Sequence, residues 1–421
     1  MSFFDIIWNW IDSRAHISDI PLKAMPEYTM DISYWTGGLL AAAFIFQAIT
    51  GVLLMLYYTP GASTAYSSTQ YIINKVPFGI ILLNAHLYMA YVMILLIFIH
   101  FFRNYYIGAY KKPRELAWII GILMALVVVG SGFTGYFLPY TEVSVDATDV
   151  GVGLASKFPL IGNFLASLIT GNGTISSEFG RMLDLHILIL PAILMLLFGI
   201  HMYLYEKNEA TPPVSMKTEQ KGSTLSWVPT FLSYTAGITL ILWGFVIVIA
   251  SVFPVPLAPE AGSSVIVQAM PEWYLVAPYK VIDFVPISSN IIYILLVIVI
   301  FYMLVPFFDR SESRDPKDRP FFVSIVTVNL DYFILFTIWG YLQPAVQVQP
   351  VVWIPIMLGI IAFNFGLTYG LYYKYRKVTP TGSERNSFTH SNTKNKKQHF
   401  SDASDCNDKK VTNDKKEGVD K

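Results

Sequence analysis

Eight long apolar stretches, separated by polar connections, dominate the pattern of this chain. A hydrocarbon core about 30 Å thick is crossed by roughly 20 apolar residues in helical conformation. The stretches that meet this length lie at about 33–57, 79–102, 116–137, 184–205, 230–253, 288–307, 321–342 and 351–374. The pattern predicts an all-α integral membrane protein with eight transmembrane helices.

The connections between these spans differ in length and in charge. Two of them, 138–183 and 254–287, are long, rich in Gly, Pro and aromatic residues, and fall on the same side of the membrane. Loops of that length usually carry a function. The other side holds most of the basic loop residues: Arg103, Lys111, Lys112, Arg114, Lys207, Lys217, Lys221, Arg310, Arg314, Lys317 and Arg319. Because positive charge concentrates in cytoplasmic loops, we expect both termini in the cytoplasm and the chain in the cell membrane.

Composition supports a membrane protein and divides the chain into four parts. Charged residues make up 14% of the chain and hydrophobic residues 54%, whereas a soluble domain is about 25% charged. We expect an amphipathic segment at 1–32, a four-helix bundle at 33–215, a second four-helix domain at 216–377 and a disordered polar tail at 378–421. The formal net charge is zero. We expect the chain to lie in a lipid bilayer, and we expect no nucleic acid among its partners. The single cysteine, Cys406, excludes an intrachain disulfide, an Fe–S site and haem attachment through CxxCH.

Four histidines lie inside the predicted spans, in two pairs. His86 and His100 are 14 residues apart. His186 and His201 are 15 residues apart. At about 1.5 Å and 100° per residue, each spacing covers about 21 Å of helix and returns to roughly the same face. Ionisable residues inside a membrane are costly and mark functional sites, and two such helices facing each other would place one imidazole pair near each membrane surface, as two stacked haems require.

Glycines repeat at the same interval in two other predicted spans. Gly37 and Gly51 are 14 residues apart in the first span. Gly121 and Gly135 are 14 residues apart in the third. A haem is a wide plate, and a helix that flanks it needs a residue without a side chain at the level of the porphyrin. Spans one to four are therefore predicted to form a bundle around two haems held without covalent attachment.

Two arginines near the span ends are candidates for contact with the haem propionates. Arg103 follows His100 by three residues, and Arg181 precedes His186 by five. Each could equally anchor its helix at the membrane interface. The histidines also have other interpretations, as polar residues hydrogen-bonded between helices or as a proton relay. A relay normally recruits Asp or Glu at mid-membrane depth, and the predicted spans hold almost none.

The outer loop after the fifth span contains the most specific motif, Pro271-Glu272-Trp273-Tyr274, with Tyr279 five residues further on. Supporting features are Gln47 with Thr50-Gly51, the stretch Gly135-Tyr136-Phe137-Leu138-Pro139, and Arg181 ahead of His186. Together these residues resemble cytochrome b of the quinol-oxidising cytochrome bc complexes, whose outer quinol site carries the motif PEWY. The resemblance covers roughly residues 30–375.

The resemblance implies which histidines bind which haem. His86 and His186 would ligate the low-potential haem near the outer surface. His100 and His201 would ligate the high-potential haem near the cytoplasmic surface. Both groups would be non-covalent b-type haems or haem variants with two axial histidines. Such ligation leaves no open coordination position, so the haems would pass electrons and not bind oxygen.

The resemblance also implies a quinol-oxidising site at the outer face. Glu272 would accept a quinol proton, because a carboxylate in an apolar pocket has a raised pKa. The pocket would be shaped by Tyr136, Pro271, Trp273, Tyr274 and Tyr279. One electron would pass to a Rieske iron–sulfur protein and the other through the two haems, with proton translocation. Quinol and quinone, further respiratory subunits and a second copy of the chain are the expected partners.

The chain departs from that family's pattern at several places. The 15-residue spacing of His186 and His201 is similar to the chloroplast-type branch, whereas the fusion of spans five to eight into the same chain is similar to the mitochondrial type. This combination resembles an archaeal or deep-branching bacterial form. Glu206 and Thr235 stand where the mitochondrial cytoplasm-side quinone pocket has a His and an Asp. In the first outer loop, Tyr140 replaces the usual Trp.

Two other functions are compatible with the paired histidines. One is a di-haem membrane anchor of another respiratory oxidoreductase, of the formate dehydrogenase or nitrate reductase type. Such an anchor needs four or five helices and no PEWY loop. The other is a haem-free transporter that uses the histidines for protons. Eight spans and the Pro271–Tyr274 motif favour the quinol-oxidising subunit.

Overall fold

The computed structural model describes residues 24–215, 223–263, 270–284 and 290–378, together with Ile6, Ile7, Asn9, Trp10, Ser13 and Arg14. Most of the segment predicted to be amphipathic, 1–32, lies outside the described residues. The tail predicted to be disordered, 378–421, also lies outside them beyond Val378.

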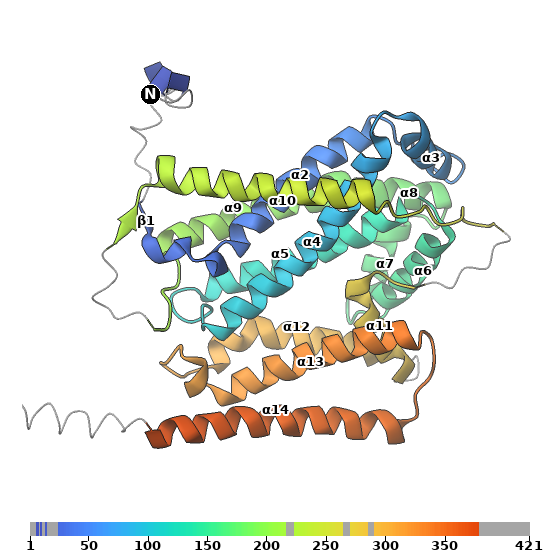
Figure 1. Ribbon diagram of the computed structural model, residues 1–421. Helices are drawn as coiled ribbons and strands as arrows, with labels where there is room; N and C mark the ends of the chain where they lie inside the picture. Colours follow the sequence, from blue (N-terminus) through green and yellow to red (C-terminus); the bar gives the residue numbers. More distant parts are fainter. Residues whose placement is uncertain are drawn as a thin grey trace, which may run out of the picture.

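Long helices lie side by side and account for most of the described chain (Figure 1). Those that coincide with the predicted spans are α2 (Thr36–Met55), α4 (Gly79–Tyr106), α5 (Glu115–Phe137), α9 (Leu190–Asn208), α10 (Leu232–Val252), α12 (Asn290–Phe308), α13 (Pro320–Leu342) and α14 (Pro350–Val378). Among the described residues, seven helical segments are long and apolar enough to cross a membrane. The remaining one is α12, whose apolar part, Ile292–Phe308, belongs to the shorter apolar helices. The prediction of eight spans is therefore confirmed for seven.

Shorter elements close the two ends of the helical body. The two long connections contain α6 (Glu142–Ser156), α7 (Gly162–Thr170), α8 (Ile175–Asp184) and α11 (Trp273–Phe284), and α3 (Ala65–Lys75) lies at the same end. We call this the loop end. The opposite, basic end contains the connections 107–114, 209–215 and 309–319. Its short elements are strands β1 (Met25–Pro26) and β2 (Thr224–Leu225), and turns η2 (Glu27–Met30), η3 (Ile32–Tyr34), η6 (Trp227–Phe231) and η7 (Pro316–Asp318).

The two long connections meet each other at the loop end. Thr141 forms an isolated antiparallel bridge with Glu260. The Glu142 N–H donates to the Pro259 carbonyl at 2.9 Å, and the Gly262 N–H donates to Glu142 Oε2 at 2.7 Å. The segment that precedes the PEWY motif is thereby attached to the N-terminus of α6.

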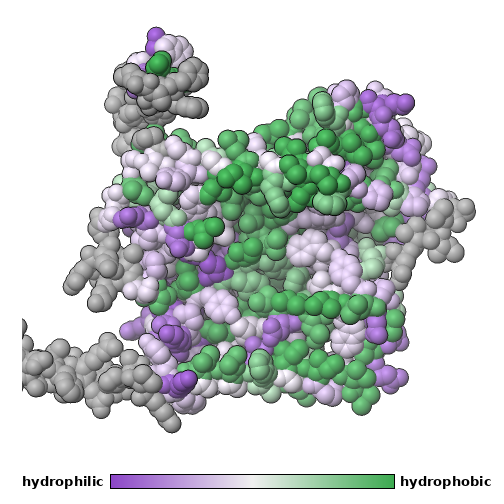
Figure 2. All heavy atoms as spheres, viewed as in Figure 1, coloured by the Kyte–Doolittle hydropathy of each residue, from purple (hydrophilic) through white to green (hydrophobic). Residues whose placement is uncertain are grey.

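The first helices pack in pairs around a common core. Helix α2 packs on α4 and α5 packs on α9, while α10 lies against both α2 and α4. The core between them includes Ala43, Ala85, Met89, Val128 and Leu194. Away from this core the helices carry exposed apolar side chains, and Figure 2 shows hydrophobic residues over the helices with polar residues gathered mainly towards their ends. Apolar surface of that extent is typical of a body that faces lipid.

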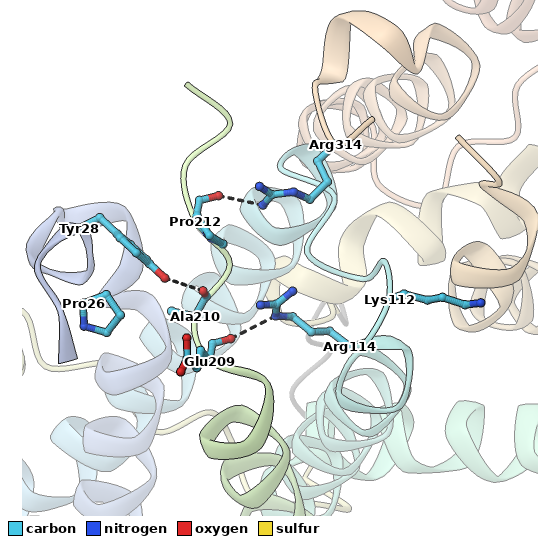
Figure 3. A pocket seen from close by; sticks show the side chains of 8 residues that line it. All are labelled: Pro26, Tyr28, Lys112, Arg114, Glu209, Ala210, Pro212 and Arg314. Atoms are coloured by element: carbon cyan, nitrogen blue, oxygen red, sulfur yellow. Dashed lines mark hydrogen bonds between the residues drawn. The ribbon is translucent and has the colours of Figure 1, made fainter. Parts of the chain in front are cut away.

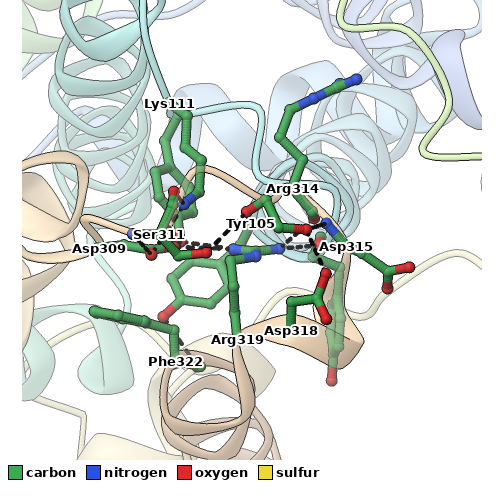
Figure 4. A network of polar contacts seen from close by, with 12 residues as sticks. Tyr105, Lys111, Asp309, Ser311, Arg314, Asp315, Asp318, Arg319 and Phe322 are labelled. Carbon is green, nitrogen blue, oxygen red and sulfur yellow. Dashed lines mark hydrogen bonds and ion pairs between the residues drawn. The ribbon is translucent and has the colours of Figure 1, made fainter. Parts of the chain in front are cut away.

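A buried charge cluster at the basic end joins the first bundle to the later helices (Figure 4). The carboxylate of Asp309, which follows α12, forms ion pairs with Lys111 Nζ at 2.9 Å and with Arg319 Nη1 at 3.3 Å. Tyr110 donates to the same carboxylate at 2.6 Å. The side chains of Asp309 and Arg319 are fully buried. One carboxylate is thus paired with two cations, and it connects the turn between α4 and α5 to the connection between α12 and α13.

Candidate haem and quinol sites

A π-helical turn, η4 (Leu185–Ile189), sets the position of His186 ahead of α9. The Leu190 N–H donates to the Leu185 carbonyl, five residues back, so this turn holds one residue more than an α-turn would. Pro191 follows, and the wider turn relieves the clash that a proline ring makes with the carbonyl four residues before it. The π-turn accommodates the extra residue in the 15-residue His186–His201 spacing. His186 can therefore face His86 while His201 faces His100, although His86 and His100 are only 14 residues apart.

The structure brings the predicted histidine pairs together across the bundle. The ring centroids of His86 and His186 are 6.2 Å apart, with their planes at 74°. A metal atom bound at about 2 Å by one nitrogen of each ring needs centroids about 6 Å apart. His100 and His201 form the second pair, close enough to interact electrostatically. One pair lies towards the loop end of the bundle and the other towards the basic end.

Two backbone carbonyls of α5 orient the histidines of η4 and α9. His186 Nδ1 is 2.9 Å from the Ser131 carbonyl oxygen, and His201 Nδ1 is 3.1 Å from that of Ala117. A carbonyl oxygen can only accept, so Nδ1 must carry the hydrogen and Nε2 keeps its lone pair. Each ring is thereby held in the tautomer that can bind a metal through Nε2.

Threonine hydroxyls of α2 orient the histidines of α4 in the same way. His86 Nδ1 lies 2.8 Å from Thr50 Oγ1, and the Thr50 hydroxyl donates its own hydrogen to the Phe46 carbonyl at 2.7 Å. The threonine oxygen therefore accepts from the ring. His100 Nδ1 lies 2.9 Å from Thr36 Oγ1, while its Nε2 is 2.9 Å from Asn104 Nδ2. A metal bound at Nε2 of His100 would replace the contact with Asn104.

Each predicted glycine faces one predicted histidine. A Cβ added at Gly51 would lie 3.3 Å from Cε1 of His86, and one at Gly37 would lie 3.4 Å from Cε1 of His100. A Cβ at Gly121 would lie 3.7 Å from Cε1 of His201. A Cβ at Gly135 would overlap the ring of His186. The glycines thus make room for the imidazoles and for the plate that the imidazoles would hold.

A local sequence signal accompanies these glycines. Threonine precedes three of the four, at Thr36, Thr50 and Thr134. The first two reach their histidines directly, and Thr134 Oγ1 lies 3.5 Å from His186 Nδ1. In α5 the accepting carbonyls come four residues before each glycine. Each of the four histidines therefore has, on the neighbouring helix, one glycine next to its ring and one oxygen that accepts from its Nδ1.

These residues fit two haems with two axial histidines each. The donor set is four imidazoles with Nδ1 engaged, and among the described residues no group of three or more His, Cys, Asp or Glu side chains could hold a bare metal ion. Buried polar atoms near the two pairs lack a hydrogen-bond partner in the described part of the chain, namely Gln47 Oε1 and Arg103 Nε. The guanidinium of Arg103 lies 3.8 Å from the centroid of the Tyr34 ring and donates to Asn104 Oδ1 at 3.0 Å. Arg181, the other predicted propionate ligand, is exposed on α8.

The PEWY residues lie where α11 meets α4, α5 and α13. Glu272 accepts a hydrogen bond from the hydroxyl of Tyr91 on α4. Tyr274 is buried, and its hydroxyl lies against Gly132 of α5, 2.9 Å from the place that a Cβ would take. The ring of Trp273 lies 6.3 Å from that of Phe98 on α4 and 6.4 Å from that of Phe333 on α13.

The other predicted quinol-site residues differ in their closeness to Glu272. Tyr136 lies near enough to interact electrostatically with the carboxylate. Pro271 and Tyr279 are half-buried, and the structure records no hydrogen bond between Glu272 and either of them. Burial raises the pKa of the Glu272 carboxyl above its ordinary value, and the hydrogen bond from Tyr91 partly opposes that rise. The carboxylate is therefore suited to hold a proton closer to neutral pH than an exposed glutamate can.

Tyr91 and Tyr140 show what the sequence left undetermined. Tyr91 is not part of any motif, and its partner Glu272 lies 181 residues further along the chain. Tyr140, which replaces the family's usual Trp, has a positive φ of 51° and packs against Phe137 and Phe179 at 5.9 and 4.9 Å. Its carbonyl accepts from the Ala261 N–H at 3.2 Å. Tyr140 thus holds the corner between α5 and α6 against the second long connection.

The basic end contains a polar cavity of 280 Å³ (Figure 3). It is lined by Pro26, Tyr28, Lys112, Arg114, Glu209, Ala210, Pro212 and Arg314. Arg114 donates to the carbonyls of Asn208 and Glu209 at 2.7 and 3.1 Å, which caps the C-terminus of α9. None of the predicted site residues lines this cavity. Thr235, at a position of the expected inner quinone pocket, donates within its own helix to the Phe231 carbonyl at 2.9 Å.

Two family models match consecutive parts of the chain. Residues 91–260 match the family described as Cytochrome b(N-terminal)/b6/petB, and residues 263–363 match Cytochrome b(C-terminal)/b6/petD. Cytochrome b of Sulfolobus acidocaldarius is 37% identical over 370 residues, which are 79% of this chain and 65% of that protein. The chain thus spans just under two thirds of that relative.

Other relatives and one solved structure agree with these matches. A cytochrome bc complex cytochrome b subunit of Chlorobaculum thiosulfatiphilum is 32% identical over 330 residues, 75% of this chain and 77% of that protein. Cytochrome b6 of Heliobacterium modesticaldum is 37% identical over 212 residues, 49% of this chain and 100% of that protein. A chain of the structure titled "Hyperthermophilic respiratory Complex III" superposes with a TM-score of 0.70 at 25% identity, covering 87% of this chain and 96% of that one.

Proposed function

The chain belongs to the cytochrome b family, and from that membership we propose that it is the di-haem membrane subunit of a quinol:acceptor oxidoreductase. The family assigns it to electron transport, implies b-type haem, and makes it an integral multi-pass membrane protein of a multi-subunit respiratory complex similar to Complex III.

His86 and His186 would hold one haem near the loop end, and His100 with His201 would hold the second near the basic end. The haems, when bound, supply one-electron transfer between the two faces of the membrane. The hydrogen bonds at each Nδ1 keep Nε2 available and fix the plane of each imidazole. Arg103, whose buried Nε has no hydrogen-bond partner in the described part of the chain, would bind a propionate of the second haem. Arg181 is the corresponding candidate at the loop end.

Quinol oxidation is assigned to the loop end, which would face outward. Glu272 accepts one proton from a quinol hydroxyl, and its buried setting favours the protonated carboxyl that results. Pro271, Trp273 and Tyr274 with Tyr136 and Tyr279 would form the pocket walls and exclude water. One electron leaves to a Rieske iron–sulfur protein, and the other crosses to the basic end, so that protons are released on one side of the membrane.

The remaining assignments concern topology and partners. The basic end, where β1 and the C-terminal end of α14 lie, would face the cytoplasm, because it carries most of the Lys and Arg residues of the connections. The two functional domains would lie at 33–215 and 216–377, and α10 of the second domain packs on α2 and α4 of the first. A homodimer and further respiratory subunits complete the proposed assembly.

The observation that carries this proposal is the pairing of each of the four histidines with a glycine of a neighbouring helix. A reduced-minus-oxidised spectrum of the purified membrane protein should show b-type haem at two per chain. Substituting Glu272→Gln should slow quinol oxidation at least tenfold while both haem signals remain. One haem per chain, or none, would contradict the di-haem assignment. Unchanged quinol oxidation in Glu272→Gln would contradict Glu272 as the proton acceptor of the outer quinol site.

A further inference from the structure

A polar stripe runs along one face of α4 towards the Glu272 site. Asn84, Tyr88 and Tyr91 are spaced by four and three residues, which places them on the same helical face. Asn84 Oδ1 accepts from the Val255 N–H at 2.7 Å. The Tyr88 hydroxyl donates to the Phe253 carbonyl at 2.6 Å. The stripe therefore follows the chain from the end of α10 towards α11.

Tyr91 differs from its two neighbours on this stripe in the chemistry of its partner. Asn84 and Tyr88 bond to backbone groups, whose charge does not change, whereas Tyr91 donates to the Glu272 carboxylate. The ring of Tyr91 is held edge-on by that of Tyr88, with centroids 6.1 Å apart and planes at 83°. The hydroxyl of Tyr91 is thus fixed in place by packing as well as by its hydrogen bond.

Among the described residues, four titratable side chains interact electrostatically with Glu272 from the helices packed around it. They are Tyr91 on α4, Tyr136 on α5, Tyr274 on α11 and Tyr341 on α13. Of these four, Tyr91 is the one whose hydroxyl donates a recorded hydrogen bond to the carboxylate. The other three interact with it electrostatically without such a bond.

Building on the proposed quinol site, we propose that Tyr91 is a positioning residue that holds ionised Glu272 in its inward place and releases it once the carboxylate has taken up the quinol proton. A hydrogen bond to an ionised acceptor is roughly twice as strong as one between neutral groups. In the step, the quinol O–H bond breaks and an O–H bond forms on the carboxylate. Tyr91 keeps its own proton throughout. The neutral carboxyl, held less strongly, can turn and give its proton to water at the loop end.

The test is the pH dependence of quinol oxidation by the intact complex. Glu272 accepts a proton only when ionised, so the rate falls as pH drops through its pKa. The acid limb of the pH profile is the range in which the rate falls as the pH drops. Because the hydrogen bond from Tyr91 lowers the pKa of Glu272, Tyr91→Phe should move this limb to higher pH by about one unit. At pH values below the pKa of Glu272 the rate should then be about tenfold lower. Tyr88→Phe is the matched control, since it removes a neighbouring hydroxyl that does not touch Glu272. It should leave the limb in place.

Further variants separate the possible failures. Tyr91→Gln keeps an N–H donor and should restore the limb towards its original pH. An unmoved limb in Tyr91→Phe, or an equal movement in Tyr88→Phe, overturns the proposal. Should Tyr91→Phe lose its haems, infrared titration of the Glu272 carboxyl in Tyr91→Met, which also lacks a donor, and in the unsubstituted protein decides. A higher pKa of Glu272 in Tyr91→Met supports the proposal, and identical titrations overturn it. A normal rate and limb in Glu272→Gln would instead refute the proposed proton acceptor itself.

Discussion

Each haem-binding position in this chain is a small group of residues and not a single histidine. At His86 the group is Thr50, which accepts from Nδ1, and Gly51, whose missing side chain leaves room for the ring. At His186 the corresponding parts are the Ser131 carbonyl and Gly135. The acceptor fixes the tautomer and the glycine fixes the distance of approach. Both must come from the neighbouring helix, so the ligands are positioned only when the helices have packed.

The two glycines of α5 should respond differently to the same substitution. A Cβ at Gly135 would overlap the His186 ring, whereas one at Gly121 would make an ordinary contact of 3.7 Å with His201. Overpacking costs about 1–3 kcal/mol, so Gly135→Ala should reduce haem content from two per chain to about one. Gly121→Ala should retain two. Haem and protein quantified in the same preparation provide the measurement, and equal haem content in the two variants would argue against the approach distances described here.

The residues of the candidate site were predictable from sequence to different degrees. The histidine spacing and the PEWY tetrapeptide are local signals, and so is a threonine that precedes a glycine. Tyr91 gave no such signal, because its role depends on a contact with a residue 181 positions away. Asn104 was missed for a related reason, since its contact with His100 follows from a side-chain orientation that spacing does not specify.

At the level of elements, the transmembrane helices follow from apolar length, whereas their irregular turns do not. The spans were predictable because hydrophobic length is a property of one segment at a time. The helices α6, α7, α8 and α11 are short and lie in connections that sequence reasoning treated as loops. In the sequence, the π-turn η4 is visible only as one additional residue between His186 and His201. Because the widened turn accommodates that residue, the helix that follows keeps His201 on the same face as His186.

The widened turn η4 should make two single-residue deletions differ in their effect on haem binding. Deleting exposed Leu188 should turn the π-turn into an α-turn, bring the His186–His201 spacing to that of α4, and leave two haems per chain. Deleting exposed Leu95, between His86 and His100, has no widened turn to absorb it. It should rotate one ligand by about 100° and lose a haem. Haem content per chain is the readout, and retention of both haems after the Leu95 deletion would be inconsistent with a strict register.

At the level of the whole molecule, the first bundle and the later helices are joined at both ends by side chains buried between them. Near the loop end, Tyr274 of α11 belongs to the same core as α2, α4, α5 and α10. Towards the basic end, the Trp118 indole of α5 donates to the Tyr302 carbonyl of α12 at 2.7 Å. A relative that matches only about half of this chain is itself a whole cytochrome b6.

The Asp309 cluster should contribute most of the polar stabilisation of this joint. Asp309→Asn leaves Lys111 and Arg319 without a charged partner in a buried site, a change that typically costs about 3–5 kcal/mol. The thermal unfolding midpoint of the solubilised protein should fall accordingly, and Glu312→Gln, an exposed charge in the same connection, should leave it unchanged. The double variant Asp309→Leu with Arg319→Met should recover part of the loss, because it leaves one cation, Lys111, without a charged partner instead of two. Both the single and the double variant could instead unfold at the same temperature as the unsubstituted protein. In that case the later helices are held by the packing of α12 on α5 and of α11 on the common core, and the buried charges are not needed for stability.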